Sequence, residues 1–119
     1  MITGGLATIY VGDMERAVKF WTETLGLKLQ YQAGGGWAQI DAGKGLVLGL
    51  HGTHEGGPQP GQNGSTTIGF ELDEPMDHAY QKLSDRGVKF HGPIHDTEHV
   101  RLAYFSDPDG NSFYLSENK

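Results

Sequence analysis

Residues 105–115, Phe-Ser-Asp-Pro-Asp-Gly-Asn-Ser-Phe-Tyr-Leu, are the stretch of sequence that says most about the fold. Its centre, Asp107-Pro108-Asp109-Gly110, combines the residue types of a tight turn, because proline presets φ, glycine accepts positive φ and aspartate side chains cap the backbone. Apolar and polar residues alternate on both sides, which is typical of strands. We therefore predict that residues 100–105 and 112–115 form a hairpin and that the four turn residues are structural.

The N-terminal part of the chain predicts a strand followed by a helix. Residues 6–11 alternate in polarity, Asp13 is a favourable N-cap, and Gly26 suits the left-handed conformation that ends many helices. Between these two residues apolar side chains recur at steps of three and four, and they are Met14, Ala17, Val18, Trp21 and Leu25. This spacing indicates a helix whose buried face includes Trp21.

The rest of the chain repeats this order of elements. Alternation predicts further strands, which are residues 27–31, 37–40 and 46–50 in the first half and residues 67–72, 88–90, 100–105 and 112–115 in the second. A second helix is expected to begin at residues 73–75. The repeated order predicts an internal duplication, with one module at about residues 1–51, a glycine- and proline-rich linker at 52–66 and a second module at 67–119.

Two motifs resemble those of the vicinal oxygen chelate superfamily, which includes glyoxalase I, bleomycin-resistance proteins, fosfomycin-resistance proteins and extradiol dioxygenases. They are Val11-x-Asp13-Met14-x-x-Ala17-x-x-Phe20-Trp21-x-x-x-Leu25-Gly26-Leu27 and Phe105-x-Asp107-Pro108-Asp109-Gly110-Asn111-x-x-x-Leu115-x-Glu117. The resemblance covers nearly the whole chain. It implies an α+β fold of the glyoxalase/bleomycin-resistance type, in which two tandem βαβββ modules form a concave-sheet cup with the helices outside. It also implies a homodimer that binds a small organic molecule.

The resemblance also locates the positions at which metal-using members of that superfamily bind a divalent cation. Carried over position by position, they are Leu6, Gly49, Thr67 and Tyr114. None of these is a histidine or a carboxylate, and the side chains of leucine and glycine contain no donor atom. We therefore expect no metal at these positions and no cofactor. The alternative is a divalent metal at a non-standard site formed by His51, Glu71 and Gln39.

The alternation in each strand predicts which side chains line the cup. The expected ligand-binding residues are aromatic or polar and come from different strands: Tyr10, Trp37, Gln39, His51, Tyr104 and Tyr114. Aromatic rings suit flat or cationic organic ligands, although the same rings could only fill the space between the modules. A register error of one residue would remove Trp37, Gln39 and Tyr104 from the cup.

Glu71 and several histidines are further candidates for chemistry. Glu71 is a carboxylate on the concave side of its strand, where it either reaches water or takes a role in the cup. His51 either lines the cup or simply ends a strand, and the glycines that follow it argue against a helix that would align it with His54. We expect solvated side chains at the remaining positions considered, His78, His91, His95, His99, Lys19 and Arg101.

Composition excludes several classes of function. Nine Lys and Arg against fifteen Asp and Glu, with a net charge of −6, argue against nucleic acid, and no apolar run reaches the roughly 18 residues of a membrane span. The absence of cysteine fits a cytoplasmic protein.

The expected function is metal-independent binding of an aromatic or cationic organic molecule. The alternative is a glyoxalase-like lyase, isomerase or dioxygenase with a relocated metal or acid–base site at His51, Glu71 and Tyr114. A third alternative is an accessory domain with a vestigial cup.

Overall fold

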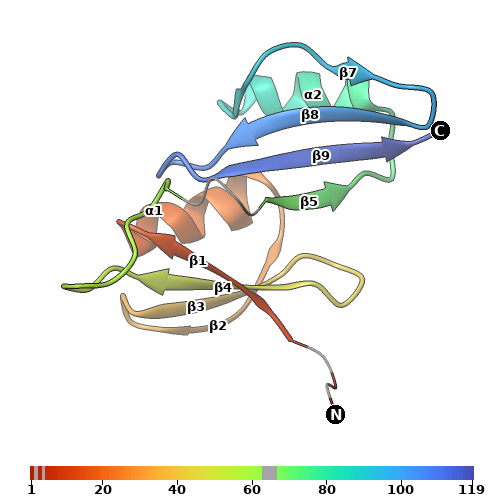
Figure 1. The fold of residues 1–119 in the computed structure, drawn as a ribbon. Coiled ribbons are helices and arrows are strands. Elements are labelled where there is room, and N and C mark those ends of the chain that lie inside the picture. Colours follow the sequence, from red (N-terminus) through yellow and green to blue (C-terminus); the bar gives the residue numbers. More distant parts are fainter. Residues whose placement is uncertain (2, 4, 63–66) are drawn as a thin grey trace. The chain divides into compact units, whose positions relative to one another are not determined.

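A computed structural model of the chain describes residues 1, 3, 5–62 and 67–119 (Figure 1). The chain divides into two compact units, Met1–Pro60 and Gly61–Lys119, and each unit contains its own sheet and its own helix. We refer to them as the first and second modules. The α+β fold and the tandem βαβββ plan predicted from the sequence are confirmed.

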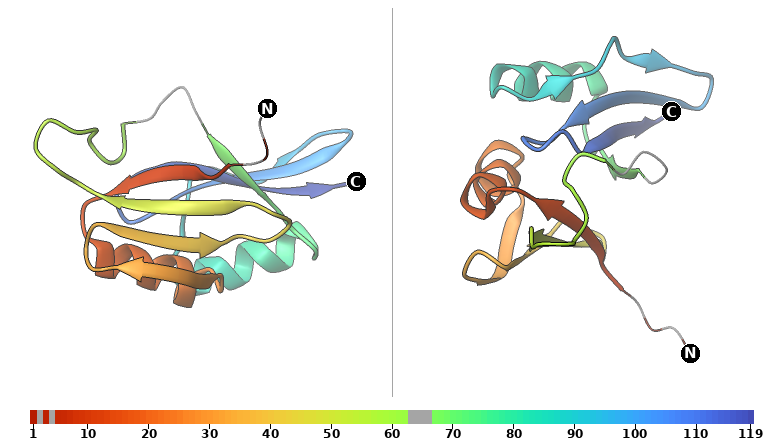
Figure 2. Two further views of the ribbon diagram at one scale, coloured as in Figure 1. Left: turned by 90° about the horizontal axis from the view of Figure 1, so that it is seen from below. Right: turned by 60° about the vertical axis from the view of Figure 1, so that its left-hand side comes forward.

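The first module is a four-stranded sheet with the order β1-β4-β3-β2. Its elements are β1 (Ala7–Val11), α1 (Met14–Lys19), the π-helical turn η1 (Phe20–Thr24), β2 (Lys28–Ala33), β3 (Trp37–Asp41) and β4 (Val47–Gly52). β1 pairs with β4 in parallel and the other pairs are antiparallel. The helix covers one face of this sheet (Figure 2). The core on that face consists of fully or almost fully buried side chains, among them Val11, Ala17, Trp21, Ile40, Leu48 and Leu50.

The second module repeats the plan with the strand order β5-β9-β8-β6 and a short extra strand beside β8. Its elements are β5 (Ile68–Glu71), α2 (Met76–Asp85), β6 (Lys89–Phe90), β7 (His95–Asp96), β8 (Val100–Ser106) and β9 (Ser112–Asn118). Met76 and Ala79 of α2 are buried, as are Phe105, Phe113 and Leu115 of the sheet. The three sheet residues follow the alternation of their strands and lie on the face that packs against α2.

Three local features differ from the sequence-based predictions. The first helix changes to π geometry after Lys19, and the Leu25 N–H donates to the Phe20 carbonyl five residues before it (3.0 Å). Trp21 remains completely buried despite this change, so its predicted face is confirmed. His95 belongs to the short strand β7, which the sequence analysis does not predict, and its side chain is exposed as expected. The third feature, a bulge in β2, affects the candidate site and is described with it.

The turn that identifies the hairpin is held by its own side chains. Asp107 Oδ1 accepts from the backbone N–H groups of Asn111 (2.8 Å) and Asp109 (3.0 Å), and Asn111 Oδ1 accepts from the Gly61 N–H (2.7 Å). Asp107 is 5% exposed, and this burial raises the pKa of its carboxyl group. The structural role predicted for the turn is therefore confirmed.

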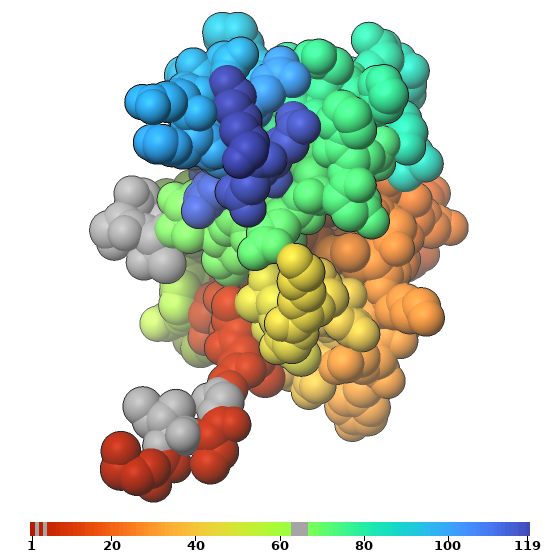
Figure 3. All heavy atoms as spheres, turned by 90° about the vertical axis from the view of Figure 1, so that its right-hand side faces the viewer, coloured from red at the N-terminus to blue at the C-terminus, as the bar shows by residue number. Residues whose placement is uncertain are grey.

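The described residues before β1 are exposed and project from the first module (Figure 3). Among residues 1, 3, 5–62 and 67–119, no helix combines the length and the apolar character that crossing a membrane requires.

Candidate functional site

In the first module, one row of aromatic side chains crosses three strands on the face opposite the helix. Trp37 lies directly opposite His51, and His51 lies directly opposite Tyr10, so the three side chains point to the same side of the sheet. The ring centroids of Tyr10 and His51 are 4.7 Å apart with the planes inclined by 31°, and His51 meets Trp37 edge-on at 6.0 Å. We call the surface around these rings the Trp37 face.

The Trp37 indole lies across the backbone of β4 at Gly49. A Cβ atom added to Gly49 would overlap the six-membered ring of the indole, so only glycine allows the ring to lie this close to the strand. The indole is half-buried and Gly49 is buried. One of the four positions at which the resemblance implies a metal ligand, Gly49, is thus covered by an aromatic ring.

A chain of side-chain hydrogen bonds fixes the edge of the indole. The Trp37 Nε1–H donates to Gln39 Oε1 (3.1 Å), and the Gln39 Nε2–H donates to Gln30 Oε1 (3.4 Å). The three residues lie on β3 and β2, and the chain of bonds extends the Trp37 face from an aromatic ring to a pair of amides.

A bulge in β2 adds two residues that the sequence analysis missed. Leu29 pairs with the buried Ile40, whereas Tyr31 pairs with Gln39, so the strand carries one extra residue between these two pairs. As a result both Gln30 and Tyr31 lie on the Trp37 face, where regular alternation would put Tyr31 with Leu29. Tyr31 is 57% exposed. The only sign in the sequence is the weak polarity pattern of residues 28–33, which does not locate a bulge.

The second module carries a related arrangement built on tyrosines. A Cβ atom added to Gly69 would overlap the Tyr114 ring, and Tyr114 lies opposite Gly69 on one side and opposite Tyr104 on the other. The Tyr104 and Tyr114 centroids are 5.8 Å apart, and His95 meets Tyr104 edge-on at 5.8 Å. Glu71 is exposed and lies two residues beyond Gly69 on the same face, opposite Ser116.

The predicted site residues therefore fall into two groups. Tyr10, Trp37, Gln39 and His51 come together in the first module, and Tyr104 and Tyr114 come together in the second, with Glu71 on the same face as the tyrosines. The structure describes each group within its own module.

The four positions at which the resemblance implies metal ligands do not fit a metal ion. Leu6 is 47% exposed and offers only carbon, Gly49 lies under an indole, and Tyr114 packs its ring on Gly69. Thr67, an exposed residue, offers a single hydroxyl group. Within residues 1, 3, 5–62 and 67–119, no three or more His, Cys, Asp or Glu side chains are grouped so that they could hold a metal ion.

His51 and His54 lie closer together than their glycine-rich surroundings indicate. Their ring centroids are 5.8 Å apart without any helix, and His54 is 6.3 Å from Tyr10. His51 Nδ1 is 2.6 Å from the Gly52 carbonyl oxygen, which orients the half-buried imidazole. In a neutral imidazole that donates from Nδ1, the Nε2 atom carries the lone pair.

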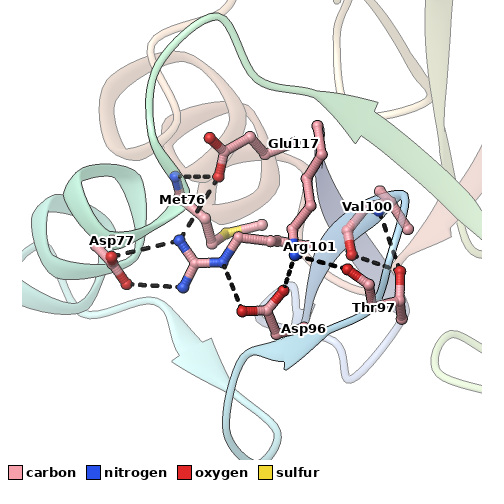
Figure 4. Close-up of polar contacts among 8 residues, drawn as sticks. Met76, Asp77, Asp96, Thr97, Val100, Arg101 and Glu117 are labelled. Atoms are coloured by element: carbon pink, nitrogen blue, oxygen red, sulfur yellow. Dashed lines mark hydrogen bonds and ion pairs between the residues drawn. The ribbon is translucent and has the colours of Figure 1, made fainter.

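Arg101, expected to be solvated, belongs instead to an ionic cluster on the helix side of the second sheet (Figure 4). Its guanidinium donates two hydrogen bonds to the Asp77 carboxylate, at 3.1 and 3.3 Å, and its side chain is 22% exposed. The hydrogen bond and the charge of Arg101 hold the pKa of Asp77 below its usual value of 3.8. Arg101 lies opposite Glu117 and Asp96, which places it on the other face from the tyrosines. The cluster is therefore structural.

Comparison with known proteins gives consistent matches along the chain. The profile of the Glyoxalase/Bleomycin resistance protein/Dioxygenase superfamily matches residues 5–115. The uncharacterized protein YetH of Bacillus subtilis (strain 168) is 31% identical over 121 aligned residues, which cover 95% of this chain and 96% of YetH.

Two crystal structures are also similar to this chain. TnmS3, an antibiotic binding protein from Streptomyces sp. CB03234, is 31% identical with a TM-score of 0.80, and the match covers 100% of this chain and 98% of TnmS3. A protein of the glyoxalase/bleomycin resistance protein/dioxygenase superfamily from Sphaerobacter thermophilus DSM 20745 is also 31% identical with a TM-score of 0.80, over 98% of both chains.

Proposed function

Because this chain belongs to the Glyoxalase/Bleomycin resistance protein/Dioxygenase superfamily, we propose that it is a small-molecule-binding protein that takes up an aromatic or cationic organic ligand without using a metal. The ligand-binding residues in this proposal are Tyr10, Trp37, Gln39, His51, Tyr104 and Tyr114. We add Tyr31, which the bulge puts on the Trp37 face.

The observation that carries this proposal is the half-buried indole that lies on Gly49. A ring pressed against a strand offers its outer π surface, and the hydrogen bond from its Nε1–H to Gln39 holds it in that orientation. Because the indole is already held in place, stacking a flat ligand on it costs the protein little conformational entropy. Each aromatic pair contributes about 0.5–1.5 kcal/mol to binding beyond the buried area. Similarity to an antibiotic binding protein over the whole chain supports a role in binding rather than catalysis.

The preference for cations is supported by the distribution of charge. Residues 61–119 contain ten Asp and Glu against five Lys and Arg, whereas residues 1–60 contain five against four. Most of the net negative charge thus belongs to the module whose sheet face carries Glu71, Tyr104 and Tyr114. Tyrosine rings and a carboxylate both attract organic cations.

The test is a fluorescence titration with 9-aminoacridine, a flat cation, and naphthalene-2-sulfonate, a flat anion. We expect saturable quenching by the cation in the wild-type protein and its loss in Trp37→Phe, because that variant keeps only the buried Trp21. Tyr114→Ala tests the tyrosine face of the second module, and it is expected to weaken binding of the cation by about 1–2 kcal/mol through the lost aromatic contact. Equal quenching in wild type and Trp37→Phe would contradict the proposal, and tighter binding of the anion would contradict the preference for cations.

A second candidate function, a glyoxalase-like lyase or isomerase, is favoured by the orientation of His51. An imidazole whose Nδ1 is held by a backbone carbonyl presents Nε2 as a base, and general base catalysis needs such a fixed group. Glu71 and Tyr114 are the other candidate catalytic residues. This function predicts glyoxalase activity that His51→Gln abolishes. Loss of that activity in EDTA would indicate a relocated metal site, and activity insensitive to EDTA would indicate acid–base catalysis.

The homodimer implied by the resemblance and the cytoplasmic location remain predictions.

A further inference from the structure

We propose that the Trp37 face selects planar molecules that place a hydrogen-bond acceptor, such as an aromatic carbonyl oxygen, on the β2 side of the indole. This inference rests on the proposed function, since it specifies the ligand of that same surface. It is carried by the direction of the hydrogen bonds that run from Trp37 through Gln39 to Gln30.

The direction of this chain follows from the chemistry of its first member. An indole Nε1–H can only donate, so the Gln39 group that faces it at 3.1 Å must be the amide oxygen. The Gln39 Nε2 then points to Gln30, at 3.4 Å from the Gln30 Oε1, and donates to it. Trp37 therefore orients the Gln39 amide, and Gln39 in turn orients the Gln30 amide. The Oε1 atoms of both glutamines point back toward Trp37.

Gln30, the last side chain in this series of hydrogen bonds, offers only donors to a ligand. Gln30 Nε2 keeps two N–H groups, and no hydrogen bond joins them to an acceptor within residues 1, 3, 5–62 and 67–119. The Gln30 side chain is exposed, so a ligand on the Trp37 ring can reach these N–H groups. The bulge is what brings Gln30 to this face together with Tyr31.

The nearby groups do not offset this preference for acceptors. The Asp41 carboxylate lies at the other end of β3 from Trp37, opposite Lys28, and one of its oxygens accepts from the Gly43 N–H (2.9 Å). The Tyr31 hydroxyl can donate or accept and so has no preference. His51, which offers an acceptor, lies across β3 from β2, on the other side of the indole.

The substitution that tests this idea is Gln30→Glu. A carboxylate at this position still accepts from Gln39 Nε2, so the indole stays fixed, but it presents oxygen instead of N–H to the ligand. Gln32→Glu is the matched control, because it introduces the same charge two residues along the same strand. Gln32 pairs with the buried Ala38, lies on the opposite face, and donates to the Gly34 carbonyl (3.0 Å).

The probes are chromone, whose polar atoms are only acceptors, and indole, whose only polar group is an N–H donor. Binding is followed through the Trp37 indole N–H resonance in ¹⁵N-labelled protein, assigned by its absence from Trp37→Phe. We expect wild type and Gln32→Glu to bind chromone more tightly than free indole. In Gln30→Glu chromone binding should weaken by about five- to tenfold, the loss of one hydrogen bond, and the order of the two probes should reverse.

Unchanged chromone binding in Gln30→Glu, or an equal loss in Gln32→Glu, would overturn the inference. If both probes bind wild type equally and shift the Trp37 resonance, the aromatic platform stands and the selection of acceptors is wrong. If neither probe shifts that resonance in wild type, the proposed function itself fails, and this inference fails with it.

Discussion

Gly49 and Gly69 show at the scale of single residues how this protein places aromatic rings against its sheets. Each glycine lies under a ring from the neighbouring strand, Trp37 in one module and Tyr114 in the other, and a Cβ atom would overlap that ring. Glycine costs a strand some stability, and here the missing side chain makes room for a ring. Each ring therefore lies flat against the neighbouring strand, and in the proposed function its outer face is the surface that a ligand contacts.

Gly49→Ala is predicted to displace the Trp37 indole. The added methyl group overlaps the ring, so the indole must leave the strand and lose its hydrogen bond to Gln39. We expect a shifted Trp37 emission maximum, loss of 9-aminoacridine binding and a destabilisation of about 1–3 kcal/mol in urea unfolding, as for an overpacked core. The control is Gly36→Ala, where nothing lies closer than 4.0 Å to the new Cβ. The prediction fails if the two variants behave alike.

At the scale of elements, helix α2 is attached to its sheet by charged side chains. The first helical N–H, that of Met76, donates to Glu117 Oε1 of β9 (2.8 Å), so a neighbouring strand caps the helix that Pro75 cannot cap with a side chain. Arg101 of β8 contacts the same carboxylate at 3.7 Å and binds Asp77 of α2 (Figure 4). The cluster thus ties the start of α2 to both central strands.

This cluster predicts a pH dependence of stability. Arg101 lowers the pKa of Asp77, and Lys119 together with Arg101 lowers that of Asp96, below the usual value of 3.8. A lowered pKa means that the carboxylates stabilise the fold above about pH 4 and lose this effect as the pH falls through their lowered values. The raised pKa of Asp107 acts in the opposite direction, because its contribution declines as the pH rises through that value.

Arg101→Met keeps the apolar stem and removes the charge, so the variant should lose less stability than wild type between about pH 4 and pH 2. Urea unfolding at a series of pH values measures this, and the titration of Asp77 by NMR should move toward its usual value. Asp107 is present in both proteins and its effect cancels. Lys82→Met serves as the control, since it removes only the exposed ion pair with Glu74 (2.9 Å). Equal acid sensitivity of wild type and Arg101→Met would contradict the assignment.

At the scale of the whole molecule, the chain retains the fold of its superfamily and has different residues at the metal positions. The four positions hold Leu6, Gly49, Thr67 and Tyr114, and two of them now belong to ring–glycine pairs. An aromatic surface and a metal centre need different side chains at the same places. The proposed binding without a metal is compatible with the fold of the superfamily, because fold alone does not determine function.

We therefore predict that removal of metal leaves the stability and the ligand affinity of the protein unchanged. Protein treated with EDTA and then dialysed should keep its melting temperature and its affinity for 9-aminoacridine, and elemental analysis of untagged protein should find less than one equivalent of divalent metal. Titration with Zn²⁺ is the complementary measurement, because a site at His51 and Glu71 would raise the melting temperature as the metal binds. A metal-dependent melting temperature would favour the enzymatic alternative.

The sequence by itself determined the order of elements apart from the short strand β7, the burial of Trp21, the structural turn at Asp107 and the face on which Trp37 and Tyr114 lie. These features depend on local rules: alternation, helical spacing, capping and turn chemistry act over a few neighbouring residues. A resemblance carried by two such local motifs was enough to indicate the superfamily.

Only the tertiary structure decided which of these residues act together. The bulge that puts Gln30 and Tyr31 together on the Trp37 face, the glycines under the rings and the ionic cluster of Arg101 all depend on how the elements pair and pack in the folded chain. A bulge changes the face on which a residue lies without changing the residue type. In the same way, the residue type of an arginine does not reveal whether its side chain is half-buried or solvated. Such features arise from the register and packing of the folded chain, which local patterns do not specify.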